Sequence, residues 1–272
     1  MIRTPLRYPG GKSRALKTIL PLVPAFSEFR EPFIGGGSVF LALKQQSSDA
    51  AFWMNDLNPE LYHFWQALRD CPDALVAGVQ RVRDEETDGR TLHRRLKGTV
   101  PTDNLARAVR FFVLNRITFS GTVEAGGYSQ GAFEKRFTQS SIERLTAVAP
   151  LLQKTTITNT DFEEVVAAPG ENVFIFLDPP YLSATKSKLY GKKGTLHTSF
   201  DHERFAAVMR SVQHKWLITY DDCDEVRELF SFAYIRSWEL QYGMNNYKQE
   251  NAARGKEVMI ANFPLETPPL CG

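Results

Sequence analysis

Seven short runs rich in β-branched and aromatic residues recur along the 272-residue chain, and helical patterns separate most of them. Strands that alternate with helices pair in parallel, with helices covering both faces of the sheet. We therefore predict an α/β fold with a mostly parallel sheet of about seven strands. The last two runs have no helical pattern between them, so we expect an antiparallel pair at one edge. The runs cover residues 28–31, 51–54, 155–159, 173–177, 215–220, 232–240 and 256–261.

Apolar residues at helical spacing mark the helices between these strands. Asn58 with Pro59, and Asp201, are residue types that begin helices, and Ser140 with Glu143 has the spacing of a capping box. We expect helices to start at these positions. The apolar faces comprise Leu16, Ile19, Leu20 and Val23; Leu61, Phe64, Trp65 and Leu68; and Phe205, Val208, Met209 and Val212.

Residues 71–150 break the alternation, because they show helical patterns and a glycine-rich loop but no convincing strand. We predict a helical insertion here, with residues 1–70 and 151–272 forming the α/β domain. Basic residues outnumber the nearby acids in this stretch, which suits either a solvated helical face or a nucleic-acid surface. The basic residues include Arg81, Arg83, Arg90, Arg94, Arg95, Lys97, Arg107, Arg110 and Arg116.

Composition narrows the class of protein only moderately. Hydrophobic residues make up 43% and charged residues 24% of the chain, as in soluble globular proteins. No apolar run approaches the roughly 18 to 20 residues that cross a bilayer, and no signal peptide is evident, so we expect a cytoplasmic protein. Cys71, Cys223 and Cys271 lack metal-ligand spacing, so neither zinc nor disulfides are expected.

A glycine cluster, Gly35, Gly36 and Gly37, follows the first predicted strand and precedes a helical run. Such a turn lets the backbone approach a ligand closely, and the helix N-terminus offers unpaired N–H groups. About 20 residues further on, Asp56 ends the second strand, where α/β nucleotide sites place a carboxylate against ribose hydroxyls. A simple tight turn and a helix cap are the alternatives, but together the two signals favour a nucleotide-like ligand.

The apolar strand 173–177 runs directly into Asp178-Pro179-Pro180-Tyr181, at the strand end where open α/β sheets bind ligands. An exocyclic amine of a nucleobase is a poor nucleophile because its lone pair is delocalised into the ring. Hydrogen bonds from the amine to the Asp178 carboxylate and the Pro179 carbonyl would stabilise the positive charge that develops during methyl transfer. Pro179 and Pro180 fix the backbone, and Tyr181 offers a face on which an extruded base can stack. A proline-stiffened strand exit is the structural alternative.

Five segments resemble, in the same order, those of the Dam-type (D12-class) DNA adenine methyltransferases; they are 6–12, 31–38, 55–58, 160–162 and 178–181. The resemblance implies a Rossmann-like, S-adenosylmethionine-dependent methyltransferase fold with an inserted helical DNA-recognition domain. It implies that Asp178 is catalytic and also lies beside the cofactor. The cofactor contacts that it implies are Tyr8, Lys12, Pro32, Phe33, Gly35, Gly37, Ser38, Asp56, Asp161 and Phe162.

Residues 111–121 resemble the segment that leads to this family's DNA-reading hairpin, whereas 122–133 differ from the GATC-methylating members, so the sequence predicts no target site. A lysine-rich loop after the catalytic strand suits phosphate contact, with a solvated loop as the alternative. The predicted DNA contacts are Arg95, Asn115, Arg116, Ser120, Tyr128, Gln130, Lys186 and Lys188.

We therefore predict methyl transfer to N6 of a flipped adenine in duplex DNA, by a monomer that needs no metal because the sulfonium already activates the methyl group. A second hypothesis is methylation of another sp² nitrogen in RNA, protein or cytosine; the N-terminal cofactor segment and the insertion argue against it. A nucleic-acid-binding protein without turnover is a third, and the presence of Lys12, Asp56, Asp178 and Tyr181 argues against that. A nicotinamide dehydrogenase is a weaker fourth, because the glycine spacing is wrong for it.

Overall fold

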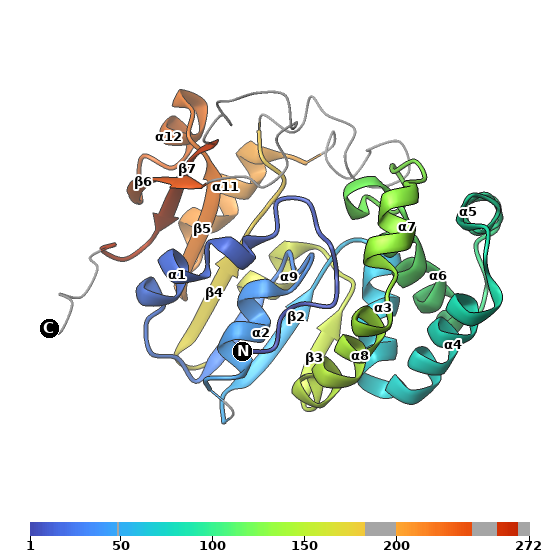
Figure 1. Cartoon of the computed structure of the whole chain (residues 1–272). Coiled ribbons are helices and arrows are strands. Elements are labelled where there is room, and N and C mark those ends of the chain that lie inside the picture. Colours follow the sequence, from blue (N-terminus) through green and yellow to red (C-terminus); the bar gives the residue numbers. More distant parts are fainter. Residues whose placement is uncertain (48, 183–199, 241–254, 266–272) are drawn as a thin grey trace, which may run out of the picture.

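The computed structural model describes residues 1–47, 49–182, 200–240 and 255–265 (Figure 1). Seven strands form one sheet in the order β3-β2-β1-β4-β5-β7-β6. Only β7 runs antiparallel to its neighbours; the other pairs are parallel. The strands are β1 (Glu28–Glu31), β2 (Ala51–Asn55), β3 (Thr155–Thr158), β4 (Val173–Leu177), β5 (Lys215–Asp221), β6 (Tyr234–Leu240) and β7 (Gly255–Ala261).

The strand predictions are confirmed, with bounds that shift by at most two residues. The expected antiparallel pairing of the last two strands is also confirmed. β7 lies between β5 and β6, so Ala261 pairs with Leu217 on one side and with Tyr234 on the other. β6 therefore forms the edge of the sheet.

Helices cover both faces of the sheet, which explains why every residue of β4 is buried. On one face, α1 (Leu16–Ile19) and α2 (Ser38–Lys44) pack against a core that includes Phe29 and Phe174. On the other face, a second core contains Ile175 and Trp216. The helices of that face are α9 (Phe162–Ala167), α11 (His202–Ser211) and α12 (Asp224–Leu229).

Between β2 and β3 the chain is helical, as predicted. Figure 1 shows these helices gathered beyond the β3 edge of the sheet. Their buried residues, among them Trp65 and Phe112, belong to the same core as Phe29, and the division at residues 71 and 150 stays a prediction. The helices are α3 (Pro59–Asp70), α4 (Pro72–Glu85), α5 (Gly89–Gly98), α6 (Asn104–Ile117), α7 (Gln130–Arg136) and α8 (Gln139–Val148). The described residues also contain four 3₁₀ turns: η1 (Lys12–Arg14), η2 (Leu20–Leu22), η3 (Phe119–Gly121) and η4 (Ala149–Leu152).

Two of the three expected helix starts are confirmed. The side chains of Asn58 and Asp201 accept hydrogen bonds from the first turns of α3 and α11. The predicted capping box at Ser140 is wrong. α8 begins at Gln139 with Thr138 as its N-cap, because the Thr138 carbonyl already accepts from Ser141 N at 2.9 Å.

The helix expected through Val23 is shorter than predicted. α1 ends at Ile19 and a 3₁₀ turn follows. Pro21 lies in that turn, and because proline lacks an N–H it cannot make the next α-helical hydrogen bond. In the part of the chain that the structure describes, no helix combines the length and apolarity needed to span a bilayer.

Candidate active site

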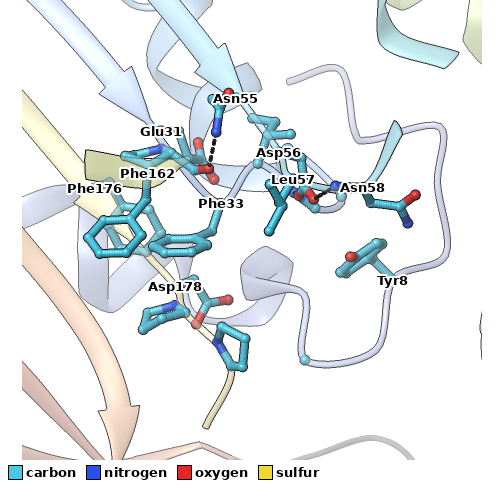
Figure 2. Close-up of a pocket in the computed structure, with 18 of the residues that line it drawn as sticks. Tyr8, Glu31, Phe33, Asn55, Asp56, Leu57, Asn58, Phe162, Phe176 and Asp178 are labelled. Carbon is cyan, nitrogen blue, oxygen red and sulfur yellow. Dashed lines mark hydrogen bonds between the residues drawn. The ribbon is translucent and has the colours of Figure 1, made fainter. Parts of the chain in front are cut away.

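A cavity of about 490 Å³ opens where the carboxyl ends of β1, β2 and β4 meet. Glu31, Asp56 and Asp178 end or directly follow these three strands, and all three line the cavity. Figure 2 shows Tyr8 and Phe33 on different sides of the same space, with Asp178 beneath it. A cavity of this size suits a small organic ligand.

The glycine turn after β1 forms one wall of the cavity, and Tyr8 packs directly on it. Gly35 and Gly37 have φ values of +44° and +66°, which favour glycine. A Cβ atom on Gly35 would lie 2.8 Å from Tyr8 Cε1, and one on Gly36 would lie 2.9 Å from Tyr8 Cβ. Glycine is therefore required here both by conformation and by the close approach of the tyrosine.

The carboxylate of Asp56 is oriented by two backbone amides. Gly35 N donates to Oδ2 at 3.1 Å and Asn58 N donates to Oδ1 at 3.0 Å. Burial raises the pKa of Asp56 to about 6, and these hydrogen bonds oppose the shift. Because Asn58, not Asp56, caps α3 through Glu60 N, the alternative of a simple helix cap does not describe Asp56.

Aromatic rings form another wall. The rings of Phe33 and Phe162 stack with centroids 5.7 Å apart. The guanidinium of Arg204 lies 5.1 Å from the Phe162 centroid and donates to both carboxylate oxygens of Asp161, which lowers the pKa of Asp161. Arg204 comes from α11 and was not predicted as a site residue.

Asn55 joins two of the predicted segments at their backbones. Its amide nitrogen donates to Pro32 O and to Thr160 O, both at 3.0 Å. Its oxygen accepts from Thr160 N at 2.9 Å. Asn55 itself lines the cavity and is 1% exposed, so it fixes these two parts of the wall to each other.

Asp178 is held by residues from two distant segments. Lys12 Nζ lies 2.8 Å from its Oδ2, and Thr219 Oγ1 donates to its Oδ1 at 2.8 Å. Lys12 is 4% exposed, and its Nζ also lies 5.0 Å from the centroid of the Tyr181 ring. One face of Tyr181 packs on Tyr220, with centroids 5.8 Å apart, and burial raises the pKa of Tyr181 well above its ordinary value.

Two buried carboxyl groups beside Asp178 were missed by the sequence analysis. Glu31 lines the cavity, is 3% exposed, and its Oε2 has no hydrogen-bond partner among the described residues. Burial and the nearby Asp178 raise the pKa of Glu31 well above its ordinary value. Burial also raises the pKa of Glu257, on β7, to about 7. Glu31 ends β1 and Glu257 lies within β7. Without the order of strands in the sheet, neither position indicates that the residue lies beside Asp178.

The family model that describes the D12 class N6 adenine-specific DNA methyltransferases matches the sequence of this chain over residues 8–244. The chain belongs to this family. The expected family and the methyltransferase-type α/β fold are thereby confirmed, and a methyl donor of the S-adenosylmethionine type is implied.

Curated relatives agree with this membership in the D12 class. The DNA N-6-adenine-methyltransferase of Escherichia phage P1 is 27% identical over 237 residues, which cover 84% of this chain and 31% of that protein. The Type II methyltransferase M1.LlaDCHI of Lactococcus lactis subsp. cremoris is 26% identical over 211 residues, 74% of this chain and 70% of its own length. The DNA adenine methylase of Vibrio cholerae serotype O1 is 27% identical over 183 residues, which cover 65% of this chain and 64% of that protein. The chain thus spans less than a third of the phage protein.

The predicted cofactor and catalytic residues of this D12-class chain come together around one cavity. Fourteen positions were predicted in these two groups, and the cavity lining includes every one of them. They are Tyr8, Lys12, Pro32, Phe33, Gly35, Gly37, Ser38, Asp56, Asp161, Phe162, Asp178, Pro179, Pro180 and Tyr181.

The predicted DNA contacts divide into exposed and buried residues. Gln130 is exposed, the Arg95 side chain is 58% exposed and pairs with Glu86, and Ser120 and Tyr128 are partly exposed. A single antiparallel bridge from Thr118 to Tyr128 closes the loop between them, so this loop is not an extended hairpin of strands.

Asn115 and Arg116 are different, because both side chains lie in the interior. Asn115 is 0% and Arg116 4% exposed, and the Arg116 guanidinium donates to the Pro5 carbonyl. Burial, with the neighbouring arginines, lowers the pKa of Arg116 to about 9. Burial of both side chains does not support their predicted contacts with DNA, and these contacts stay predictions. Lys186 and Lys188 lie outside the described residues, where the structure offers no test.

Among the residues that the structure describes, no group of three or more His, Cys, Asp and Glu side chains is arranged to hold a metal ion.

Proposed function

We propose that this D12-class chain transfers the methyl group of S-adenosylmethionine to N6 of an adenine flipped out of duplex DNA. One observation carries the proposal: the Asp178 carboxylate, followed by Pro179, lines the same cavity as the glycine turn and Asp56. An acceptor for an amine therefore adjoins a site suited to a nucleoside-like methyl donor.

The residues of the cavity fit such a donor. S-adenosylmethionine carries a sulfonium, an amino group and two ribose hydroxyls, and when bound it supplies an electrophilic methyl group. The carboxylates of Glu31, Asp56 and Asp178 complement those cationic and donor groups. Asp56 would accept from the ribose hydroxyls, and Phe33 with Phe162 would flank the adenine ring.

Asp178 and Pro179 would activate the target amine. Lys12 and Thr219 fix the carboxylate before the base arrives, so little reorganisation is needed during the reaction. The amine would donate its two N–H groups to the Asp178 carboxylate and the Pro179 carbonyl, which favours a pyramidal nitrogen with an available lone pair. Tyr181, stiffened by Tyr220, would support the flipped base.

The loop from Thr118 to Tyr128 is our candidate for the DNA-contacting element. Phe119 in this loop is 70% exposed, the second most exposed large apolar side chain among the described residues. An exposed aromatic ring can insert between base steps or replace an extruded base in the stack. Ser120, Tyr128 and Gln130 lie in or beside the same loop and supply polar contacts.

The test is to incubate unmethylated genomic DNA with the purified protein and S-adenosylmethionine, and then to locate modified bases by single-molecule sequencing. We expect N6-methyladenine at one short motif with the wild type and none with Asp178→Ala. Calorimetry should show that both proteins bind the cofactor. A cofactor-binding wild type that leaves every adenine unmodified would contradict the proposal and direct the search to RNA and protein digests.

A further inference from the structure

Asn115 stands out because it is a fully buried polar side chain that holds two segments outside its own helix. Its Oδ1 accepts from Arg7 N at 2.9 Å, and its Nδ2 donates to Arg7 O at 2.7 Å and to Gly121 O at 3.1 Å. The side chain thus pairs with both backbone groups of Arg7, as a neighbouring strand would. Residues 1–11 contain no helix or strand, so the sheet does not hold this backbone.

The loop from Thr118 to Tyr128 lies directly against the same backbone. Gly121 has a φ of +75°, and a Cβ atom there would lie 2.3 Å from Arg7 O. The Arg7 guanidinium also donates to Thr118 O at 3.2 Å. A shift of this loop must therefore move the Arg7 backbone or break these contacts.

The next residue after Arg7 is Tyr8, which forms part of the cavity wall. Its ring touches Gly35, whose backbone N–H orients the Asp56 carboxylate. A short path of direct contacts therefore connects the exposed loop to Asp56, and Asn115 is the residue that fixes Arg7 to Gly121.

We infer that Asn115 is a positioning residue that couples the binding of DNA at the loop from Thr118 to Tyr128 to the binding of the methyl donor at Tyr8. This inference rests on the proposed function, since that function assigns the two sites. Asn115 would act through Arg7 and Gly121, and DNA that fixes the loop would fix the tyrosine wall of the cavity. Because coupling between two binding equilibria is reciprocal, the cofactor must strengthen DNA binding by the same factor.

The coupling is measured as the ratio of two dissociation constants. S-adenosylhomocysteine is titrated by calorimetry into the full chain, alone and with an unmethylated duplex that carries the motif found by sequencing. For the wild type we expect the duplex to tighten binding by about fivefold or more.

Two variants should reduce the ratio to within about twofold of one. Asn115→Asp keeps the acceptor for Arg7 N but turns a carboxylate oxygen toward the carbonyls of Arg7 and Gly121. Gly121→Ala leaves Asn115 intact, but its added methyl group pushes the loop away from the Arg7 carbonyl. This variant therefore tests the coupling even if Asn115→Asp does not fold. Gly98→Ala, which meets open space, is the matched control and should keep the wild-type ratio.

The ratio separates coupling from a merely structural role, which would weaken binding with and without DNA alike. A wild-type ratio of one, or a wild-type ratio retained by both variants, would overturn the role of Asn115 while methylation of the duplex still supports the proposed function. A wild type that does not methylate the duplex would overturn both.

Discussion

The ammonium group of Lys12 lies 2.7 Å from one carboxylate oxygen of Asp178 and 2.8 Å from the other. The two residues are 166 positions apart, and each belongs to a different motif of the chain. Lys12 is also fixed by the Gly10 carbonyl at 2.9 Å. The N-terminal segment therefore belongs to the proposed catalytic centre, because it holds the carboxylate that would accept from the target amine.

Replacing Lys12 by methionine should lower kcat/KM by about 100-fold, or roughly 2.7 kcal/mol, because the variant removes a buried, charge-assisted hydrogen bond to Asp178. Methyl transfer to the motif-bearing duplex measures the effect. Lys17→Met, at an exposed position of α1, is the matched control and should behave as the wild type. Equal activities of the two variants would show that the ion pair has no catalytic role.

Thr219→Val should lower kcat by about tenfold while changing cofactor affinity by less than about threefold. Valine keeps the shape of this fully buried side chain but removes the hydroxyl that donates to Asp178 Oδ1. Thr219→Ser restores the donor and should recover most of kcat. If serine and valine reduce kcat equally, packing rather than the hydrogen bond explains the loss.

Cofactor affinity should rise with pH through about 6, because the ionised Asp56 carboxylate accepts from ribose hydroxyls better than the protonated form does. Burial raises the pKa of Asp56 to about 6, so the carboxyl is mostly protonated one pH unit lower. Calorimetry should show up to about tenfold tighter binding near pH 7.5 than near pH 5. Asp56→Asn does not titrate, so it should bind weakly and lose this dependence; a dependence that persists would assign it to Glu31 or another group.

Gly36→Ala should weaken cofactor binding by about tenfold or more, since its Cβ would lie 2.9 Å from Tyr8 Cβ and the tyrosine must move from the cavity wall. Gly98→Ala adds the same methyl group where no atom lies within 4 Å, so its affinity should stay within about twofold of the wild type. An unchanged affinity of Gly36→Ala would mean that the position of Tyr8 does not matter for the cofactor.

The strands and much of the site could be predicted because their signals are local. Val173–Leu177 is a continuous apolar run with a motif at its end, and Asn58 and Asp201 cap helices through neighbours in sequence. Two predictions from local signals were wrong. Ser140 has the spacing of a cap, but the N-cap of α8 is Thr138, two residues earlier, and Pro21 ends α1 before the apolar pattern does.

Local propensity and periodicity predicted which segments are strands, where two of the helices begin and which motif is the candidate for the chemistry, because these preferences act between near neighbours. The folded chain was needed to show that Thr219 and Lys12 hold Asp178, that β7 lies between β5 and β6, and that Asn115 is buried against Arg7. These contacts join residues 41, 166 and 108 positions apart. Which distant groups meet depends on the order of strands in the sheet, and no local preference of the chain encodes that order.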